Sequence, residues 1–386
     1  MTTRLCDPSL SFLVMTSQGV EKISCGKLKC GDLLVTQQQD TFVKVEDVIS
    51  TSSASIVITP YKGEKFHVAT NSLIAAKTSA YKRVSSGDEV LLYAGDEDMQ
   101  KEHVIHRFKI YYTKLHLPPK QYLISPYLMG YWCCKRSGRI LKISRADILA
   151  KLKEECKRSG FGLHFFHQDK ERKSYEPSPQ VPDTDGFKEV TLKRKAPTPT
   201  GKEEKMYRMD DTFLTLLHKS NIKCVNFPTQ PLPVEYINGS LEQRIDLLSG
   251  VLDAVSYMQN EGCTFDLTLR DQDLLMTIEF VARSIGLSTN VKETGELNSG
   301  RFTNSRVVNP DGSLKVVNRL WISGNVGILR CANVTKQVSR DIKARNVTGM
   351  SVEISATHVP FIKLTTDKEC PIVCSDFTVF SGVERK

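Results

Sequence analysis

Two parts of the chain, about 120 positions apart, repeat the same order of apolar and polar segments. The first copy runs from QYLISPYLMGYWCC through RILKIS to RADILAKLKEECKRSGF, and the second runs from LEQRIDLLSGVLDAVSYM through CTFDLTLR to DQDLLMTIEFVARSIGL. Gly130 and Gly250 hold equivalent positions in the apolar helices, and Gly160 and Gly286 are placed to end the second helix of each copy. Two copies are too few for a solenoid, so the pattern predicts a pair of units related by a pseudo-twofold axis.

The segments on either side of this repeat have the texture of β-structure. Runs such as SFLVMTS, FVKVEDVIS and SIVITPY alternate with Gly, Ser and Asp turns over residues 1–120, and SVEISATHVPFIKLTT restores that texture after residue 340. We therefore expect an α+β fold. A β-domain, split into residues 1–120 and 339–386, would carry an inserted two-repeat domain at 121–338. Within it, residues 166–209 are rich in Pro, Lys, Glu and Asp and should form a surface excursion around one strand, FKEVTLK.

The charge balance favours a polyanionic partner. The chain has a formal net charge of +9, and the surplus is concentrated in KEECKRSGF, DKERK and TLKRKAPTPTGKEEK. The segment LKRKAPTP resembles a short nuclear-import signal. These features indicate binding to nucleic acid without identifying its kind.

Cysteine usage and hydropathy bound the compartment. The eleven cysteines form an odd set with no CxxC pair, so neither a zinc site nor a disulfide framework is indicated. No apolar run approaches the roughly 20 residues of a membrane span, and the N-terminus is a poor signal peptide. We expect a protein with reduced thiols in the nucleus or cytoplasm, without a membrane partner.

Several segments together resemble the LAGLIDADG homing endonucleases carried by inteins. LLSGVLDAVSYM, preceded by PLPVEYI, resembles the second LAGLIDADG helix, PYLMGYWCC resembles the first, and LWISGNVGILRCANVTKQ resembles the end of the second repeat. SFLVMTSQGVEKISCGKLKCGDLL and DFTVFSG resemble the beginning and end of a self-splicing Hint domain. The resemblance implies a split Hint-like β-domain with an inserted LAGLIDADG domain of αββα-type repeats.

The resemblance also implies a catalytic geometry that this sequence has lost. Gly130 and Gly250 would bring the two helices into close contact, and each helix would end in an acid that holds Mg²⁺. Lys135 and Val255 stand at those acid positions. A lysine about 4 Å from a divalent ion costs roughly 8 kcal/mol at an effective dielectric of 20. We therefore expect no metal cofactor and no DNA cleavage.

Other functional groups of the family are degenerate too. Of two assisting lysines, one position holds Gln230 and the other aligns with Lys336, which is a catalytic relic or an ordinary basic residue. In the Hint-like part, Cys6 could be the splicing nucleophile, but Asn71 stands where the activating histidine would be, and FSGVERK lacks the terminal His-Asn. Splicing is therefore not expected.

The prediction is a double-stranded DNA-binding protein, acting as a monomer, that has lost cleavage and splicing. Arg139 and Leu141 lie on one face of the strand RILKIS and Lys142 lies on the other, and the sequence does not say which face meets DNA. The candidate DNA contacts are basic residues, namely Lys135, Arg136, Arg139, Arg145, Lys193, Arg194, Lys195 and Lys336.

Two other functions stay open. One is a magnesium-dependent endonuclease with a rearranged acid set, in which Asp253 acts with Asp266 or Asp147, although Asp253 points away from the metal position and reads more simply as structural. The other is a scaffold that binds another protein. Salt-insensitive binding to a protein, without affinity for DNA, would favour the scaffold.

Overall fold

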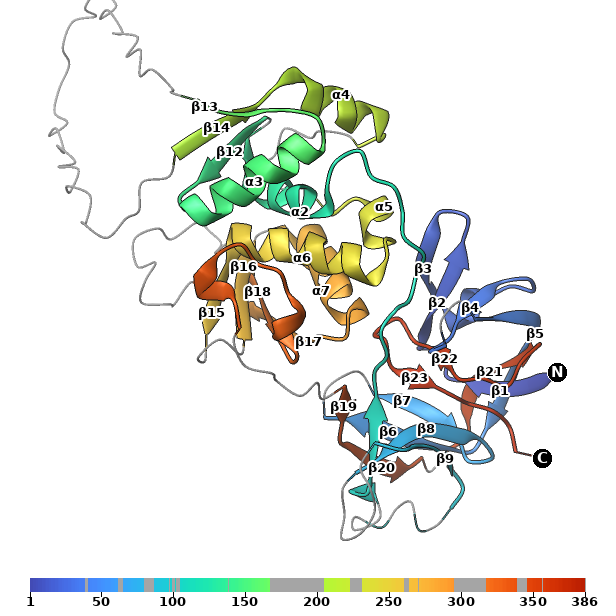
Figure 1. Cartoon of the computed structure of the whole chain (residues 1–386). Coiled ribbons are helices and arrows are strands. Elements are labelled where there is room, and N and C mark those ends of the chain that lie inside the picture. The colour runs from blue at the N-terminus through green and yellow to red at the C-terminus, as the bar shows by residue number, and fades with distance from the viewer. Residues whose placement is uncertain are drawn as a thin grey trace, which may run out of the picture.

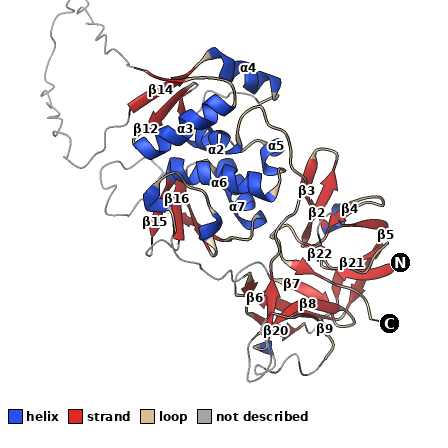
Figure 2. Cartoon of the chain, viewed as in Figure 1, coloured by secondary structure: helices blue, strands red, loops and turns tan. Residues whose placement is uncertain are grey.

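The structure is a computed structural model of the whole chain (Figure 1). It describes residues 1–38, 41–61, 65–79, 87–96, 98, 101, 105–137, 139–166, 205–222, 231–259, 264–269, 271–294, 317–338, 346–355 and 357–385. The fold is mixed α+β, as predicted, with mostly antiparallel sheets. Figure 2 shows the long helices gathered in one part of the molecule and a strand-rich part beside them.

The strand-rich part is built from both ends of the chain, and we call it the β-domain. Its N-terminal strands are β1 Thr2–Cys6, β2 Ser11–Thr16, β3 Gly19–Ser24, β4 Leu33–Val35, β5 Phe42–Ser53, β6 Ser55–Pro60, β7 Phe66–Ala69, β8 Leu73–Thr78, β9 Glu89–Tyr93 and β10 Phe108–Tyr111. Its C-terminal strands are β19 Val347–Thr348, β20 Met350–Ile354, β21 Val359–Thr366, β22 Ile372–Val373 and β23 Val379–Phe380.

Strands from the C-terminal segment complete the sheets of the N-terminal segment. The largest sheet has the order β1-β21-β5-β4-β2-β3, so β21 lies between two N-terminal strands. Similarly, β20 pairs with β6 and β19 pairs with β10. Buried side chains on the facing strands, including Phe12, Val43, Ile58 and Leu364, form one core. Neither segment could bury its apolar face alone.

The middle of the chain folds as two units with the same order of elements, and we call it the two-repeat domain. The first unit contains α2 Pro126–Lys135, β11 Arg136–Ser137, β12 Ile140–Ile143, α3 Ala146–Arg158, β13 Leu163–Phe165, β14 Lys205–Met209 and α4 Asp211–Lys219. After the short helix α5 Val234–Ile237, the second unit contains α6 Leu241–Val255, β15 Ser256–Gln259, β16 Thr264–Leu269, α7 Gln272–Ser284, β17 Ser288–Thr294 and β18 Val317–Ser323. Two short 3-10 turns follow, Val326–Ile328 and Val334–Lys336.

The two units also share their sheet topology and helix ends. Their strand orders are β11-β12-β14-β13 and β15-β16-β18-β17, which are equivalent position by position. Gly160 and Gly286 both have positive φ, and the residue after each donates its N–H to a carbonyl five residues earlier. This hydrogen bond closes the end of α3 and of α7, as the placement of the glycines predicted. Helix α6 begins with a capping box between Ser240 and Gln243.

Helices α2 and α6 pack against each other through the two glycines. A Cβ atom added to Gly130 would overlap the carbonyl oxygen of Leu247 and lie 3.1 Å from the nitrogen of Val251. One added to Gly250 would overlap the carbonyl oxygen of Tyr127. Each glycine therefore meets the residue three positions before the other glycine, so the two helices contact each other in symmetric register. As a result, the C-terminal ends of the two helices lie in equivalent places.

Buried polar groups join the two-repeat domain to the β-domain. The Arg244 guanidinium is fully buried and donates to the carbonyl oxygens of Leu115, Gly239 and Ser284. Asn238 accepts a hydrogen bond of 2.9 Å from the backbone nitrogen of Val20 in the β2–β3 hairpin. The strand-free segment from β10 to α2 is thereby fixed against α6 and α7 (Figure 1).

Candidate nucleic-acid interface

The C-terminal ends of α2 and α6 open into a cleft of about 590 Å³. Both repeats contribute to it through their first helices and adjoining strands. Among the described residues, the lining contains four cationic side chains and one carboxylate: Lys135, Lys142, Arg145, Lys336 and Asp253. The cleft is therefore a basic concavity at the pseudo-twofold contact of the repeats.

The two helices end in residues that cannot hold a divalent cation. Lys135 is the last residue of α2 and Val255 is the last of α6, each five positions after its helix's interface glycine. Both are half-buried and both line the cleft. Because the glycine contact fixes the helices in register, these side chains occupy equivalent places, one cationic and one apolar. Mg²⁺ needs oxygen ligands, which neither of them supplies.

Lys336 is directed at the end of helix α6. Its ammonium donates hydrogen bonds of 2.5 Å to the carbonyl oxygen of Leu252 and 3.4 Å to that of Asp253. The residue is only 8% exposed. Burial lowers the pKa of the Lys336 ammonium, the Asp253 carboxylate opposes this shift, and the positive charges of Arg145 and Lys135 add to it. A cation at this position stabilises the negative end of the helix dipole.

Asp253 connects helix α6 to α2 and to the final turns of the second repeat through hydrogen bonds. Its carboxylate accepts hydrogen bonds from Tyr127 Oη at 2.7 Å and from the backbone nitrogens of Ala332 at 2.6 Å and Asn333 at 3.3 Å. Burial raises the pKa of Asp253, and the hydrogen bonds from Tyr127 and the two backbone groups oppose the shift. These contacts match the structural role that the sequence suggested for Asp253.

Arg145 is fixed at the edge of the cleft by Asp147. Its Nε lies 3.0 Å from Oδ1 and its Nη2 lies 2.7 Å from Oδ2 of that carboxylate, which also accepts from the backbone nitrogens of Ile148 and Val334. The Arg145 side chain, together with these hydrogen bonds, lowers the pKa of Asp147 to about 2. The pair joins the start of α3 in the first repeat to the final turn of the second repeat.

Lys142 is a cleft residue that the sequence analysis did not include among the candidate contacts. In β12, Leu141 and Ile143 are buried and Lys142 is exposed, so the polar face of this strand carries Lys142. Tyr131 of α2 donates a 3.0 Å hydrogen bond to the Lys142 carbonyl, which joins the strand to the helix end. The alternation of apolar residues contained the signal, but choosing the face required knowing which side the helices cover.

The other predicted contacts do not gather in the cleft. Arg139 forms an ion pair with Asp211 at the start of α4 and is not among the described residues of the cleft lining. The side chain of Arg136 lies outside the described part of the structure, as do Lys193, Arg194, Lys195 and Gln230. Of the predicted set, Lys135, Arg145 and Lys336 therefore line the cleft.

The acids of the alternative endonuclease reading are engaged separately. Asp253 binds Tyr127 and backbone groups, Asp147 binds Arg145, and Asp266 on β16 forms an ion pair with Arg319 on β18. Within the described residues, no group of three or more His, Cys, Asp and Glu side chains is arranged to hold a metal ion. These carboxylates stabilise the fold through separate contacts.

The residues of the Hint-like resemblance are also held in structural contacts. Cys6 is completely buried, and burial, together with the neighbouring Cys25 thiol, raises its pKa well above the usual value. A protonated thiol is a weak nucleophile. Asn71 donates a 3.0 Å hydrogen bond from Nδ2 to Glu384, while its Oδ1 is buried without a partner among the described residues.

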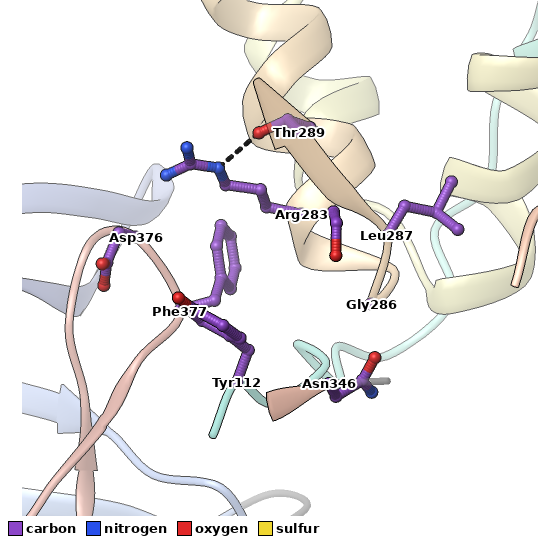
Figure 3. A pocket seen from close by; sticks show the side chains of 9 residues that line it. Tyr112, Arg283, Gly286, Leu287, Thr289, Asn346, Asp376 and Phe377 are labelled. Atoms are coloured by element: carbon purple, nitrogen blue, oxygen red, sulfur yellow. Dashed lines mark hydrogen bonds between the residues drawn. The ribbon is translucent and has the colours of Figure 1, made fainter. Parts of the chain in front are cut away.

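A second, smaller cavity lies where the two domains meet (Figure 3). Tyr112 and Phe377 of the β-domain face Arg283 and Gly286 at the end of α7, with Asp376 beside them. Arg283 donates a 2.6 Å hydrogen bond to Thr289 Oγ1 at its edge (Figure 3). The cavity has a volume of about 50 Å³, which has room for a few water molecules and is too small for a nucleotide.

Comparisons with known proteins assign no relative to this chain. No protein-family model matches the sequence, and no curated protein sequence matches it significantly. Among the described helices, none combines the length and apolar character that crossing a bilayer requires. The function must therefore be inferred from the cleft and its surroundings.

Proposed function

We propose that the protein binds double-stranded DNA through the basic cleft, which we define as the concavity lined by Lys135, Lys142, Arg145 and Lys336. The proposal includes descent from an intein-borne LAGLIDADG endonuclease, with a split Hint-like domain around the two-repeat domain. It also includes the loss of DNA cleavage and of splicing. One observation carries the proposal. Helices α2 and α6 pack with the glycine of each against the backbone of the other, and they end in a cationic residue, Lys135, and an apolar residue, Val255.

Charge supports binding and disfavours cleavage for the same reason. In a metal-dependent nuclease, acids at these two positions repel DNA until a divalent cation neutralises them. Here the cleft brings cations directly to the place where a phosphate would lie, and its single carboxylate is buried under three hydrogen bonds. Lysine and arginine side chains that contact phosphates release counterions and provide sequence-independent affinity.

Fluorescence anisotropy of a labelled 30-base-pair duplex tests DNA binding. For two to four phosphate contacts, the affinity should fall about 10- to 150-fold between 50 and 200 mM salt. Lys142→Glu should weaken binding about tenfold or more, because it reverses an exposed charge in the cleft. Arg158→Glu is the matched control, since Arg158 is exposed and ion-paired at the far end of α3, roughly 18 Å along the helix from the cleft.

Three outcomes would contradict parts of the proposal. Absence of duplex binding by the wild-type protein at 50 mM salt would refute DNA binding, and salt-insensitive capture of a protein would then favour the scaffold. Nicking of selected duplexes in the presence of Mg²⁺, abolished by Asp147→Asn or Asp266→Asn, would refute the loss of cleavage. Equal effects of Lys142→Glu and Arg158→Glu would show that binding is not centred on the cleft.

A further inference from the structure

An arginine lies beside the basic cleft on the outer face of the second sheet. Arg319 of β18 is directly opposite Thr268 of β16, and Thr268 lines the cleft. Residues opposite each other on antiparallel strands lie on the same face of the sheet. The alternate positions Leu320 and Leu267 are buried in the core. Arg319 therefore projects from the face that borders the cleft.

The Arg319 guanidinium is held in one orientation by two neighbours. Its Nε lies 2.9 and 3.0 Å from the two carboxylate oxygens of Asp266, and its Nη2 also donates to that carboxylate. Its carbon Cζ lies 4.8 Å from the centre of the Trp321 ring. Gln259 donates a further hydrogen bond to Asp266, which keeps the carboxylate in place. The side chain has therefore lost most of its rotational freedom before any ligand arrives.

The end of this guanidinium remains available to a ligand. The Arg319 side chain is 34% exposed, whereas Asp266 beneath it is 7% exposed. In the part of the chain that the structure describes, Nη1 makes no hydrogen bond. Asp266 binds the guanidinium at Nε and at one N–H of Nη2. The N–H groups of Nη1 and the second N–H of Nη2 therefore point outward together, in the plane of the guanidinium.

The first repeat has a different side chain at the equivalent position. Thr268 and Lys142 hold corresponding positions. In each repeat, the second residue after the end of the first helix pairs with a residue on the next strand, and Thr268 or Lys142 lies two residues after that partner. Met206 faces Lys142 across the strands as Arg319 faces Thr268. The first sheet thus offers a flexible ammonium beside an apolar side chain, and the second offers a fixed guanidinium. The two halves of the surface are chemically unequal.

We infer that Arg319 recognises a guanine in the half of the DNA that contacts the second sheet, so that the target site is asymmetric. This inference rests on the proposed function. The major-groove edge of guanine presents two acceptors, N7 and O6, that match a planar pair of N–H donors. A buttressed arginine suits this task better than a phosphate contact, because a phosphate accepts hydrogen bonds from many directions and does not require a fixed donor plane.

Selection of bound sequences from random duplexes tests the inference. The wild-type protein should select guanine at one position of the bound sequences. In Arg319→Lys, the preference for guanine over adenine at that position should fall about tenfold. Because Arg319→Lys keeps the charge, affinity for unselected DNA should stay within about twofold. Asp266→Asn should weaken the same preference, since it loosens the guanidinium. Lys292→Gln is the matched control, because exposed Lys292 faces Arg319 from β17.

The control should show the opposite behaviour, with weaker binding to all sequences and an unchanged guanine preference. If Arg319→Lys weakens binding to all sequences equally or leaves every base preference intact, the inference fails, while the proposal of DNA binding stands. If the wild-type protein binds no duplex at 50 mM salt, the proposed function fails and the inference with it. Thermal unfolding of each variant checks the fold, and if Asp266→Asn is unfolded, the partly exposed Arg319→Lys decides alone.

Discussion

The ammonium nitrogen of Lys336 lies 2.5 Å from the carbonyl oxygen of Leu252, three residues before helix α6 ends. This contact assigns the lysine a role inside the protein, because its donors are directed at the helix end and 8% of the residue is exposed. The same helix end carries Val255 where the endonuclease resemblance expects a metal-binding acid. The lysine that the endonuclease resemblance suggests as a catalytic relic therefore stabilises the end of α6.

We expect Lys336→Met to change the pH dependence of stability. Burial lowers the pKa of Lys336 in the folded state, so the unfolded chain binds more protons as the pH approaches 10.5. The wild-type protein should therefore gain stability relative to Lys336→Met as the pH rises from 8 toward 10.5. Urea unfolding of both proteins across this range measures the difference, and a constant difference would contradict the prediction.

Asp147→Asn should destabilise the protein at neutral pH. The folded-state pKa of Asp147 is about 2, below the ordinary value of 3.8, so its stabilising effect is fully present above about pH 4 and disappears as the pH falls through 2. Because the side chain is 22% exposed, water screens the ion pair, and we expect a loss of about 1–2 kcal/mol. Urea unfolding at pH 7, 5 and 3 should show the two proteins converging at low pH. Asp211→Asn, on an 89% exposed carboxylate, is the control and should change little.

The interface glycines should tolerate no side chain. A methyl group at Gly130 or Gly250 would overlap a backbone carbonyl of the facing helix, and a backbone cannot move aside as a flexible side chain can. We expect Gly130→Ala and Gly250→Ala each to cost about 3 kcal/mol or more, or to prevent folding. Gly26→Ala is the control, because a Cβ there would meet nothing within 4 Å. Circular dichroism and thermal unfolding give the comparison, and a folded Gly250→Ala of wild-type stability would disprove the helix contact.

Much of the fold was predictable because local chemistry and repetition agree. The glycines that end α3 and α7 adopt positive φ at the expected positions, and the apolar helices occur where their patterns indicated. The mixed α+β class followed from the change of texture near residue 121. In contrast, β14 lies at the end of the charged stretch 166–209, where we predicted a surface excursion around one strand, FKEVTLK, which lies outside the described residues. The strand exists because it pairs with both β12 and β13, and the sequence does not reveal that pairing.

The cleft was predictable only in part because its residues depend on tertiary contacts. Lys135 and Val255 could be located from the helix pattern alone. The outward face of Lys142 depends on which side α2 and α3 cover, and the Asp266–Arg319 pair joins strands 53 residues apart. Likewise, charge alone made Lys336 a candidate for phosphate, whereas its position under the end of α6 depends on how the final turn folds back.

Introducing acids at the two helix ends should make DNA binding depend on a divalent cation. In Lys135→Asp/Val255→Asp, two carboxylates would face the DNA phosphates, so affinity in EDTA should fall at least tenfold. Mg²⁺ should recover much of this loss, because it neutralises the carboxylates and accepts phosphate oxygens as ligands. Fluorescence anisotropy in EDTA and in about 5–10 mM Mg²⁺ measures both effects. The control Lys135→Asn/Val255→Asn lacks the charge and should show no recovery. Equal Mg²⁺ responses of the two double variants would mean that the helix ends do not converge on the DNA.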